Sequence, residues 1–221
     1  MFLSVLLQIT ETEAGTTQSM IDLIKAGGWT MYPQFAFSLL AIYIIVERVL
    51  AFKAAGKDSQ AFMDKVKTAV NAKDVKGAMA LCDAENTPVA RMIHKGLRRL
   101  GNPLKAIEES IENVGKIEID SLEKNLNLLA TISGAAPMLG FLGTVLGMIS
   151  TFNVIANEGS ANMDSMAAGI SEAMITTATG LIIGITAYVA YSFLSTSLQK
   201  IIHRMEFTVI EFMDILQEPS K

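Results

Sequence analysis

The sequence predicts an all-α membrane protein with three transmembrane helices, two of them very long and extending into the cytoplasm, and a cytoplasmic helical insert. Long uncharged runs alternate with a densely charged middle segment, so the hydrophobic fraction of 51% averages over two different kinds of region. Each uncharged run can supply the roughly 20 helical residues that cross a hydrocarbon core. No part of the sequence shows the apolar–polar alternation that is typical of a half-buried strand.

Residues 1–30 are expected to form a periplasmic N-terminal segment. The first nine, MFLSVLLQI, are apolar, but they lack the basic start and the longer apolar core of a secretory signal. We expect them to lie at the membrane interface, and the sequence leaves open whether they are removed.

The first transmembrane helix is predicted over residues 31–52. Trp29 and Tyr32 lie where an aromatic belt would meet one interface, and Pro33 suits the first helical turn because its missing N–H matters little there. The charged pair at residues 47–48, Glu-Arg, is expected at the opposite interface.

The charged middle of the chain, residues 53–124, is predicted to form a cytoplasmic domain of short helices. Apolar residues recur there at helical spacing, and the tripeptides Asn-Thr-Pro and Gly-Asn-Pro interrupt the pattern. The resulting helices cover residues 58–74, 73–86, 88–101 and 104 onward. We expect the fourth helix to run unbroken into the second transmembrane helix.

The second and third transmembrane helices are predicted over residues 125–157 and 165–199, joined by a periplasmic polar turn at 158–164. As single helices they would be roughly 50 Å long, more than a hydrocarbon core of about 30 Å, so both should tilt or project beyond the bilayer. They are expected to form an antiparallel hairpin. Residues 200–221 are expected to form a cytoplasmic C-terminal helix or tail.

The distribution of Lys and Arg predicts the orientation. Residues 53–124 hold 13 of them and the segment after Gln199 holds three, whereas only Lys25 precedes Arg48 and the 158–164 turn has none. Because basic residues accumulate on the cytoplasmic side, we expect the middle segment and the C-terminus in the cytoplasm, and the N-terminus and the turn outside.

Small residues in the second and third transmembrane helices predict close helix packing. They recur at four-residue spacing, which lets helix backbones approach each other in lipid. The pairs are Ala136/Gly140, Gly143/Gly147 and Gly180/Gly184. Each pair taken alone is more often a packing feature than part of a functional site. Pro137 should bend the second helix and free a carbonyl group, which then needs a partner such as a Thr hydroxyl or water.

Glu172 is the one charged residue between Ser165 and Gln199. A carboxyl group inside a bilayer is unfavourable, and such groups commonly mark ion or proton routes. We therefore predict that Glu172 is a reversible proton carrier. The alternative is a structural carboxyl group near the outer interface, since Glu172 lies only about 10 Å along the helix from Ser165.

Several threonines are close to Glu172 on a helical wheel. At 100° per residue, Thr176 lies about 40° from Glu172 and Thr179 about 20° from it, so the three side chains share a face. Thr177 lies about 140° away and should face either a pore or the second transmembrane helix, which carries Thr144. Each threonine alone is more often structural, but uncharged polar groups beside one acid suit a water-assisted proton path.

The composition disfavours several other classes of protein. A net charge of −4 argues against nucleic-acid binding, and the single cysteine, Cys82, excludes an intramolecular disulfide and a multi-Cys metal site. The two histidines, His94 and His203, are far apart in sequence, and no catalytic triad or phosphate-binding loop occurs. We expect no enzyme activity, no metal and no cofactor. Because Glu172 has no basic partner in the spans, we expect its partner group on another chain.

The run APMLGFLGTVLGMISTF followed by GISEAMITTATGL resembles the core signature of the MotA/TolQ/ExbB proton-channel family, most closely its ExbB/TolQ branch. The segment GGWTMYP before the first span and the Glu-Arg pair after it resemble ExbB-type subunits. By motif position, Glu172 matches the family's essential acid, and Thr144 and Thr177 match its two pore-facing threonines. Thr176 and Thr179 are candidates from helix geometry alone. The departures from the usual residues are Phe141, Met174 and Thr179.

The resemblance implies a homopentamer in the bacterial inner membrane, with a dimer of a single-span ExbD-like partner in its central pore. Proton flow would drive the assembly and deliver work to a TonB-like or TolA-like protein. A TolQ-like role in envelope maintenance and a non-conducting oligomeric scaffold are the alternatives, whereas three spans without an inverted repeat disfavour a secondary transporter. The sequence leaves open the transported substrate and, from physics alone, whether H⁺ or Na⁺ moves.

Overall fold

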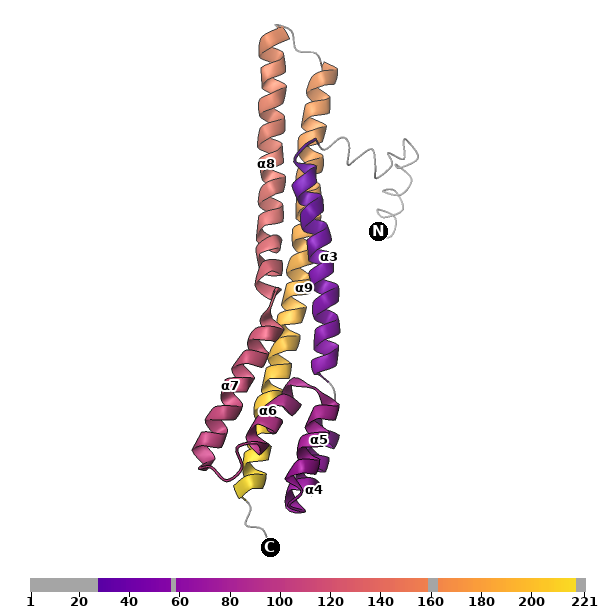
Figure 1. Ribbon diagram of the computed structural model, residues 1–221. Coiled ribbons are helices and arrows are strands. Elements are labelled where there is room, and N and C mark those ends of the chain that lie inside the picture. The colour runs from indigo at the N-terminus through magenta and orange to yellow at the C-terminus, as the bar shows by residue number, and fades with distance from the viewer. Residues whose placement is uncertain (1–27, 57–58, 159–162, 218–221) are drawn as a thin grey trace, which may run out of the picture. The chain divides into compact units, whose positions relative to one another are not determined.

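The computed structural model describes residues 28–56, 59–158 and 163–217 (Figure 1). The predicted interfacial segment at residues 1–9 lies outside the described residues, as do most of the predicted periplasmic segment, the centre of the predicted polar turn and the last four residues of the tail.

Every regular element of the described residues is a helix, which confirms the predicted all-α class. The helices are α3 (Met31–Ala55), α4 (Ser59–Asn71), α5 (Val75–Glu85), α6 (Pro88–Leu97), α7 (Leu104–Glu123), α8 (Leu126–Glu158) and α9 (Met163–Gln217). Three stretches, in α3, α8 and α9, are long and apolar enough to cross a membrane, as predicted. Helix α9 has 55 residues and includes most of the segment that was expected to follow the third span.

The chain divides into two compact units. The first, which we call the hairpin unit, comprises the described residues up to Leu40 and Ile132–Ala187. The second, which we call the insert unit, comprises Ala41–Thr131 and the described residues from Tyr188 onward. Helices α3, α8 and α9 each contribute residues to both units, and α4, α5, α6 and α7 belong to the insert unit alone.

The boundary between α5 and α6 lies where the turn residues predicted it, whereas α6 ends at Leu97, before the predicted stop at the Gly-Asn-Pro tripeptide. Asn86 ends α5 in the left-handed conformation, with φ of 47°, which asparagine adopts more readily than most residues. Thr87 then caps α6 by accepting a hydrogen bond from the N–H of Ala90 (3.3 Å), and Pro88 occupies the first turn. The predicted break and restart at residues 86–88 is therefore confirmed.

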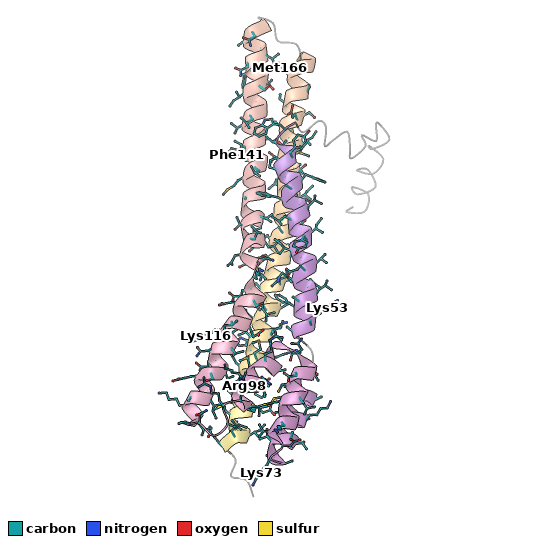
Figure 2. The ribbon with its side chains drawn as sticks, viewed as in Figure 1. Lys53, Lys73, Arg98, Lys116, Phe141 and Met166 are labelled. Carbon is teal, nitrogen blue, oxygen red and sulfur yellow. The ribbon has the colours of Figure 1, made fainter. Side chains whose placement is uncertain are left out.

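The core of the insert unit is apolar and its surface is charged. Gly96 of α6 lies against Ile111 of α7 and Phe212 of α9, so three helices meet at one point that leaves no room for a larger residue. The largest fully buried side chains there are Ile44, Met63, Val66, Cys82, Ile93, Leu97, Ile111, Leu129 and Phe212. Lys73, Arg98 and Lys116 are exposed, and Figure 2 shows Lys116 on the outer side of α7.

The expectation that α7 continues unbroken into the second transmembrane helix is wrong. Helix α7 ends at Glu123, and α8 begins at Leu126. Between them, Lys124 is extended (φ −48°, ψ 137°) and Asn125 is left-handed (φ 67°), a conformation that stops an α-helix. The last backbone bond of α7 runs from the Lys124 N–H to Asp120 O (3.1 Å).

Arg48 of α3 satisfies the carbonyl groups that this break leaves behind. In a continuous helix the carbonyls of Ser121 and Leu122 would accept from the N–H groups four residues on. Here both accept hydrogen bonds from Arg48 Nη1, at 3.0 Å each. The guanidinium group also pairs with Glu47, whose Oε2 lies 3.5 Å from Asn125 Nδ2. A cation at a helix C-terminus is favourable, so Arg48 acts as a side-chain cap for α7.

Candidate functional site

Helices α8 and α9 pack against each other as an antiparallel hairpin, as predicted. Gly140 of α8 lies against the backbone of Thr177, and further along α8, Gly147 lies against Ala173, nearer the start of α9. Positions therefore rise on α8 as they fall on α9. A Cβ built on Gly140 would come within 3.1 Å of Thr177 Cα, so only a glycine fits without a shift of the helices.

The predicted small-residue pairs all contribute to this packing. A Cβ at Gly180 would lie 2.6 Å from Ala136 O and 3.0 Å from Gly140 Cα. A Cβ at Gly184 would lie 2.5 Å from the ring of Pro137 and 3.0 Å from Ser133 O, the carbonyl four residues before the proline. The packing role of these residues is thus visible within a single chain.

The hydroxyl of Thr177 binds α8. Its Oγ1 donates to Gly140 O at 2.9 Å, and the side chain is half-buried. Helix geometry placed Thr177 about 140° from Glu172, facing either α8 or a pore, and in the single chain it faces α8. This bond also joins the two helices where Gly140 lies against the backbone of Thr177.

The other predicted threonines donate to carbonyls of their own helices. Thr176 Oγ1 donates to Ala173 O (2.8 Å), Thr179 Oγ1 to Ile175 O (2.9 Å), and Thr144 Oγ1 to Phe141 O (2.6 Å). Thr176 is buried, with 1% of its surface exposed, whereas Thr144 and Thr179 are half-buried. These bonds satisfy each hydroxyl donor and leave its oxygen able to accept a further hydrogen bond. Within the described residues, Thr144 makes no hydrogen bond to Glu172 or to the other three threonines.

Glu172 lies beside the start of α3. Its side chain is half-buried, and its carboxyl oxygen Oε1 occupies the space that a Cβ of Gly28 would fill. Gly28 has φ of 65°, and its carbonyl accepts from the Met31 N–H (3.3 Å) in the turn that begins the helix. A larger residue at position 28 would be strained by its backbone and would also overlap the carboxylate.

Two polar residues that the sequence did not single out also belong to this site: Thr30, just before α3, and Gln34, within it. Gln34 is fully buried, and its Nε2 donates to Thr176 O at 3.0 Å. Thr30 is 8% exposed, and its Oγ1 lies 3.2 Å from the position that a Cβ of Gly143 would take, where the Thr176 hydroxyl also lies. The available signal was their four-residue spacing, which places both on one helical face, but a single Gln in an apolar run does not by itself indicate burial.

The site therefore combines one carboxyl group with uncharged hydrogen-bonding groups from two helices. Among the residues that the structure describes, Glu172 forms no ion pair and no group of three potential ligands could hold a metal ion. Such an arrangement can bind and orient water around an acid that exchanges a proton. It has no nucleophile aligned with a base, which a hydrolytic site would need.

Comparison with known families decides what kind of protein carries this site. Residues 84–207 match the model of the MotA/TolQ/ExbB proton channel family. The chain belongs to that family. The matched region includes α8, most of α9 and all of the Glu172 site except its α3 residues.

Individual relatives come from both the ExbB and the TolQ groups of the MotA/TolQ/ExbB family. An ExbB homolog of Methanothermobacter thermautotrophicus is 27% identical over 192 residues, which cover 85% of this chain and 67% of the homolog. The Tol-Pal system protein TolQ of Pseudomonas aeruginosa is also 27% identical over 192 residues, covering 82% and 83%. The biopolymer transport protein ExbB of Xanthomonas campestris pv. campestris (strain B100) is 30% identical over 115 residues, covering 52% and 46%.

The family and its relatives establish the broad class. This chain is a multi-pass membrane protein and a proton channel subunit of the ExbB/TolQ type. The similarity is comparable for ExbB and TolQ relatives, so it does not distinguish between the two groups.

Proposed function

We propose that this chain is the proton-conducting subunit of an inner-membrane motor and that Glu172 carries the proton. The observation that supports this most strongly is the setting of Glu172: a single carboxyl group in an apolar helix, held against Gly28 and one helical turn from a buried Thr176. Burying an isolated carboxylate is unfavourable, so a group kept in such a place is expected to bind and release a proton.

The threonines take different roles in this proposal. Thr176 and Thr179 share the face of Glu172 and offer hydroxyl oxygens to water on the proton path. Thr177 and Thr144 lie beside the route, and Thr177 additionally fixes α9 to α8 through Gly140 O. The glycines and Pro137 hold the two helices close enough for this register to be maintained.

We propose that the working assembly is a homopentamer with an ExbD-like single-span dimer in its pore, as the family resemblance implies. The N-terminus and the 158–164 turn would be periplasmic, and residues 53–124 and the C-terminus cytoplasmic. The assembly would use the proton motive force to drive a TonB-like protein and so support transport across the outer membrane. The GGWTMYP segment favours an ExbB-like role, and a TolQ-like role in envelope maintenance is the second candidate, which the TolQ relative from Pseudomonas aeruginosa supports.

The substitution Glu172→Gln tests the proton-carrier role. It retains size and hydrogen bonding but removes the titrating proton, so we expect proton flux through the reconstituted complex to fall to background while the complex stays intact. The matched control is Glu206→Gln, which changes an exposed acid of the same helix and should leave flux unchanged. Flux is measured with a pH-sensitive dye inside liposomes, and assembly by native mass spectrometry.

Three other results would contradict the proposed role of Glu172 or of proton coupling. Loss of assembly in Glu172→Gln would support the scaffold alternative, and normal flux in an intact complex would contradict the proton-carrier role. Activity that depends on Na⁺ and is indifferent to a protonophore would contradict proton coupling. Co-expression with an ExbD-like or a TolR-like partner, followed by complementation of the matching deletion strain, separates the two family roles.

A further inference from the structure

The buried face at the start of α3 includes two polar residues, while the exposed face of the helix is apolar. Thr30, just before the helix, and Gln34, one helical turn later, are both buried there, beside the apolar Met31. The exposed side chains include Phe35, Leu39, Ile42, Tyr43 and Val46, all more than half exposed. A helix that faced water would expose its polar residues and bury its apolar ones. In lipid the apolar residues face outward, so the polar groups that α3 directs toward α9 serve a purpose other than solubility.

The orientation of the Gln34 amide is fixed by its neighbour. The group that faces Thr176 O at 3.0 Å must be the NH₂ donor, because two carbonyl oxygens would repel each other. The amide oxygen Oε1 therefore points elsewhere, and it has no hydrogen-bond partner among the residues that the structure describes. Leaving a buried acceptor unpaired is unfavourable, so native proteins rarely retain one without a use.

We propose that Gln34 Oε1 accepts a hydrogen bond from a water molecule bound between α3 and α9. Each subunit would then hold its own water site, about one helical turn inward from Glu172. The existence of this site follows from the unpaired acceptor, whereas its role in proton transfer rests on the proposed function of Glu172.

Several polar groups recur along this region. Oε1 of Glu172 lies at the position that a Cβ of Gly28 would take, the hydroxyls of Thr30 and Thr176 both lie within 3.2 Å of the position that a Cβ of Gly143 would take, and Gln34 binds the carbonyl of Thr176. Four residues of helix separate Glu172 from Thr176, which corresponds to a rise of about 6 Å. A single water molecule joins polar groups about 5.6 Å apart through two hydrogen bonds of ordinary length, so this spacing suits bound water.

The chemistry asked of the site is limited to one reversible step. The carboxyl O–H of Glu172 releases its proton to the oxygen of a neighbouring water molecule, and the carboxylate takes a proton back by the reverse step. Gln34 and Thr30 neither gain nor lose a proton. They orient the water molecules and accept hydrogen bonds from them, which makes Gln34 a positioning residue for the transfer.

The first test is direct observation in the complete wild-type complex. A cryo-EM or crystal structure detailed enough to show ordered water should contain a water molecule within about 3.2 Å of Gln34 Oε1. An Oε1 that contacts only apolar atoms, or that is bonded to a protein group, overturns the proposal whatever the variants show. This test does not depend on conduction.

The second test is the substitution Gln34→Met, which retains length and removes both polar atoms. Proton flux per assembled complex should fall about tenfold, the rate equivalent of losing one hydrogen bond to the transferring water. The matched control is Ile44→Met, which places the same side chain at another fully buried position of α3 and should leave flux unchanged.

The outcomes separate this inference from the proposed function. If Glu172→Gln abolishes flux but assembled Gln34→Met conducts normally, the function of Glu172 stands and the role of the water site is overturned. If Glu172→Gln conducts normally, the proton-carrier role fails, and the presence or absence of a water molecule at Gln34 Oε1 in the structure of the wild-type complex decides whether the water site exists. If Gln34→Met does not assemble, the structure of the wild-type complex again decides whether the water site exists.

Discussion

Replacing Arg48 with Met should uncouple α7 from its cap. In the folded chain Arg48 is 5% exposed and donates to the last carbonyls of α7, Ser121 O and Leu122 O. Methionine preserves the apolar stem of the side chain but has no donor. The variant therefore leaves two carbonyl groups at a helix end without partners and Glu47 without its cation.

The expected loss follows from these bonds. Hydrogen bonds to charged groups contribute about 1.5–3 kcal/mol each, which gives about 3–6 kcal/mol for two. Two features place the value in the lower part of this range: the Glu47 side chain is 32% exposed and can be hydrated, and methionine retains most of the packing. We expect about 3 kcal/mol, which raises local opening of the α7–α8 junction about 100-fold.

Hydrogen exchange measured by mass spectrometry on peptides covering residues 120–130 reports this opening. The control is Arg91→Met, because Arg91 also bonds a carbonyl oxygen and a carboxylate but is 43% exposed. Exposed ion pairs contribute about 0–1 kcal/mol to stability. Hydrogen exchange in Arg91→Met should therefore rise less than about tenfold over the wild-type chain. Equal effects of the two substitutions, or unchanged exchange in Arg48→Met, would refute the capping argument.

Two further predictions concern packing and thiol chemistry. Gly180→Ala places a Cβ 2.6 Å from Ala136 O and should destabilise the hairpin by about 1–3 kcal/mol. The matched control Gly134→Ala meets nothing within 4 Å and should stabilise the helix by up to about 1 kcal/mol. The thermal unfolding temperature of the detergent-solubilised chain should therefore shift in opposite directions in the two variants, and equal shifts would contradict the packing argument. Burial raises the pKa of the Cys82 thiol to about 12, so at pH 8 it is almost entirely protonated. Maleimide should therefore label native Cys82 at least about 100-fold more slowly than the unfolded chain, and rapid native labelling would show that this core opens readily.

Much of the fold could be predicted because its causes are local. Charge segregation located the three apolar stretches, and the residues Asn86, Thr87 and Pro88 stop one helix and start the next by their own conformational preferences. The phase of Thr177 relative to Glu172 also followed from helix geometry. These features depend on a residue and its near neighbours in sequence, which is the information that a single sequence contains.

The features that were missed depend on contacts between distant residues. The amphipathic pattern before Asn125 continues smoothly, and the chain breaks there in a structure where Arg48, more than 70 residues earlier, satisfies the freed carbonyls. Gln34 was missed for the same reason, because its burial depends on Thr176, which lies 142 residues away. Neither interaction leaves a periodic signal in the sequence.

The described polar groups around Glu172 carry no charge. Its Oε1 lies at the position that a Cβ of Gly28 would take, and the neighbouring polar residues are Thr30, Gln34 and Thr176. Neutral dipoles can orient a protonated carboxyl group, but they do not compensate a full charge away from bulk water. Under the proposed function, water or a cation from outside the described part of this chain would accompany release of the proton from Glu172. The acceptor at Gln34 would then provide a place where such water can bind.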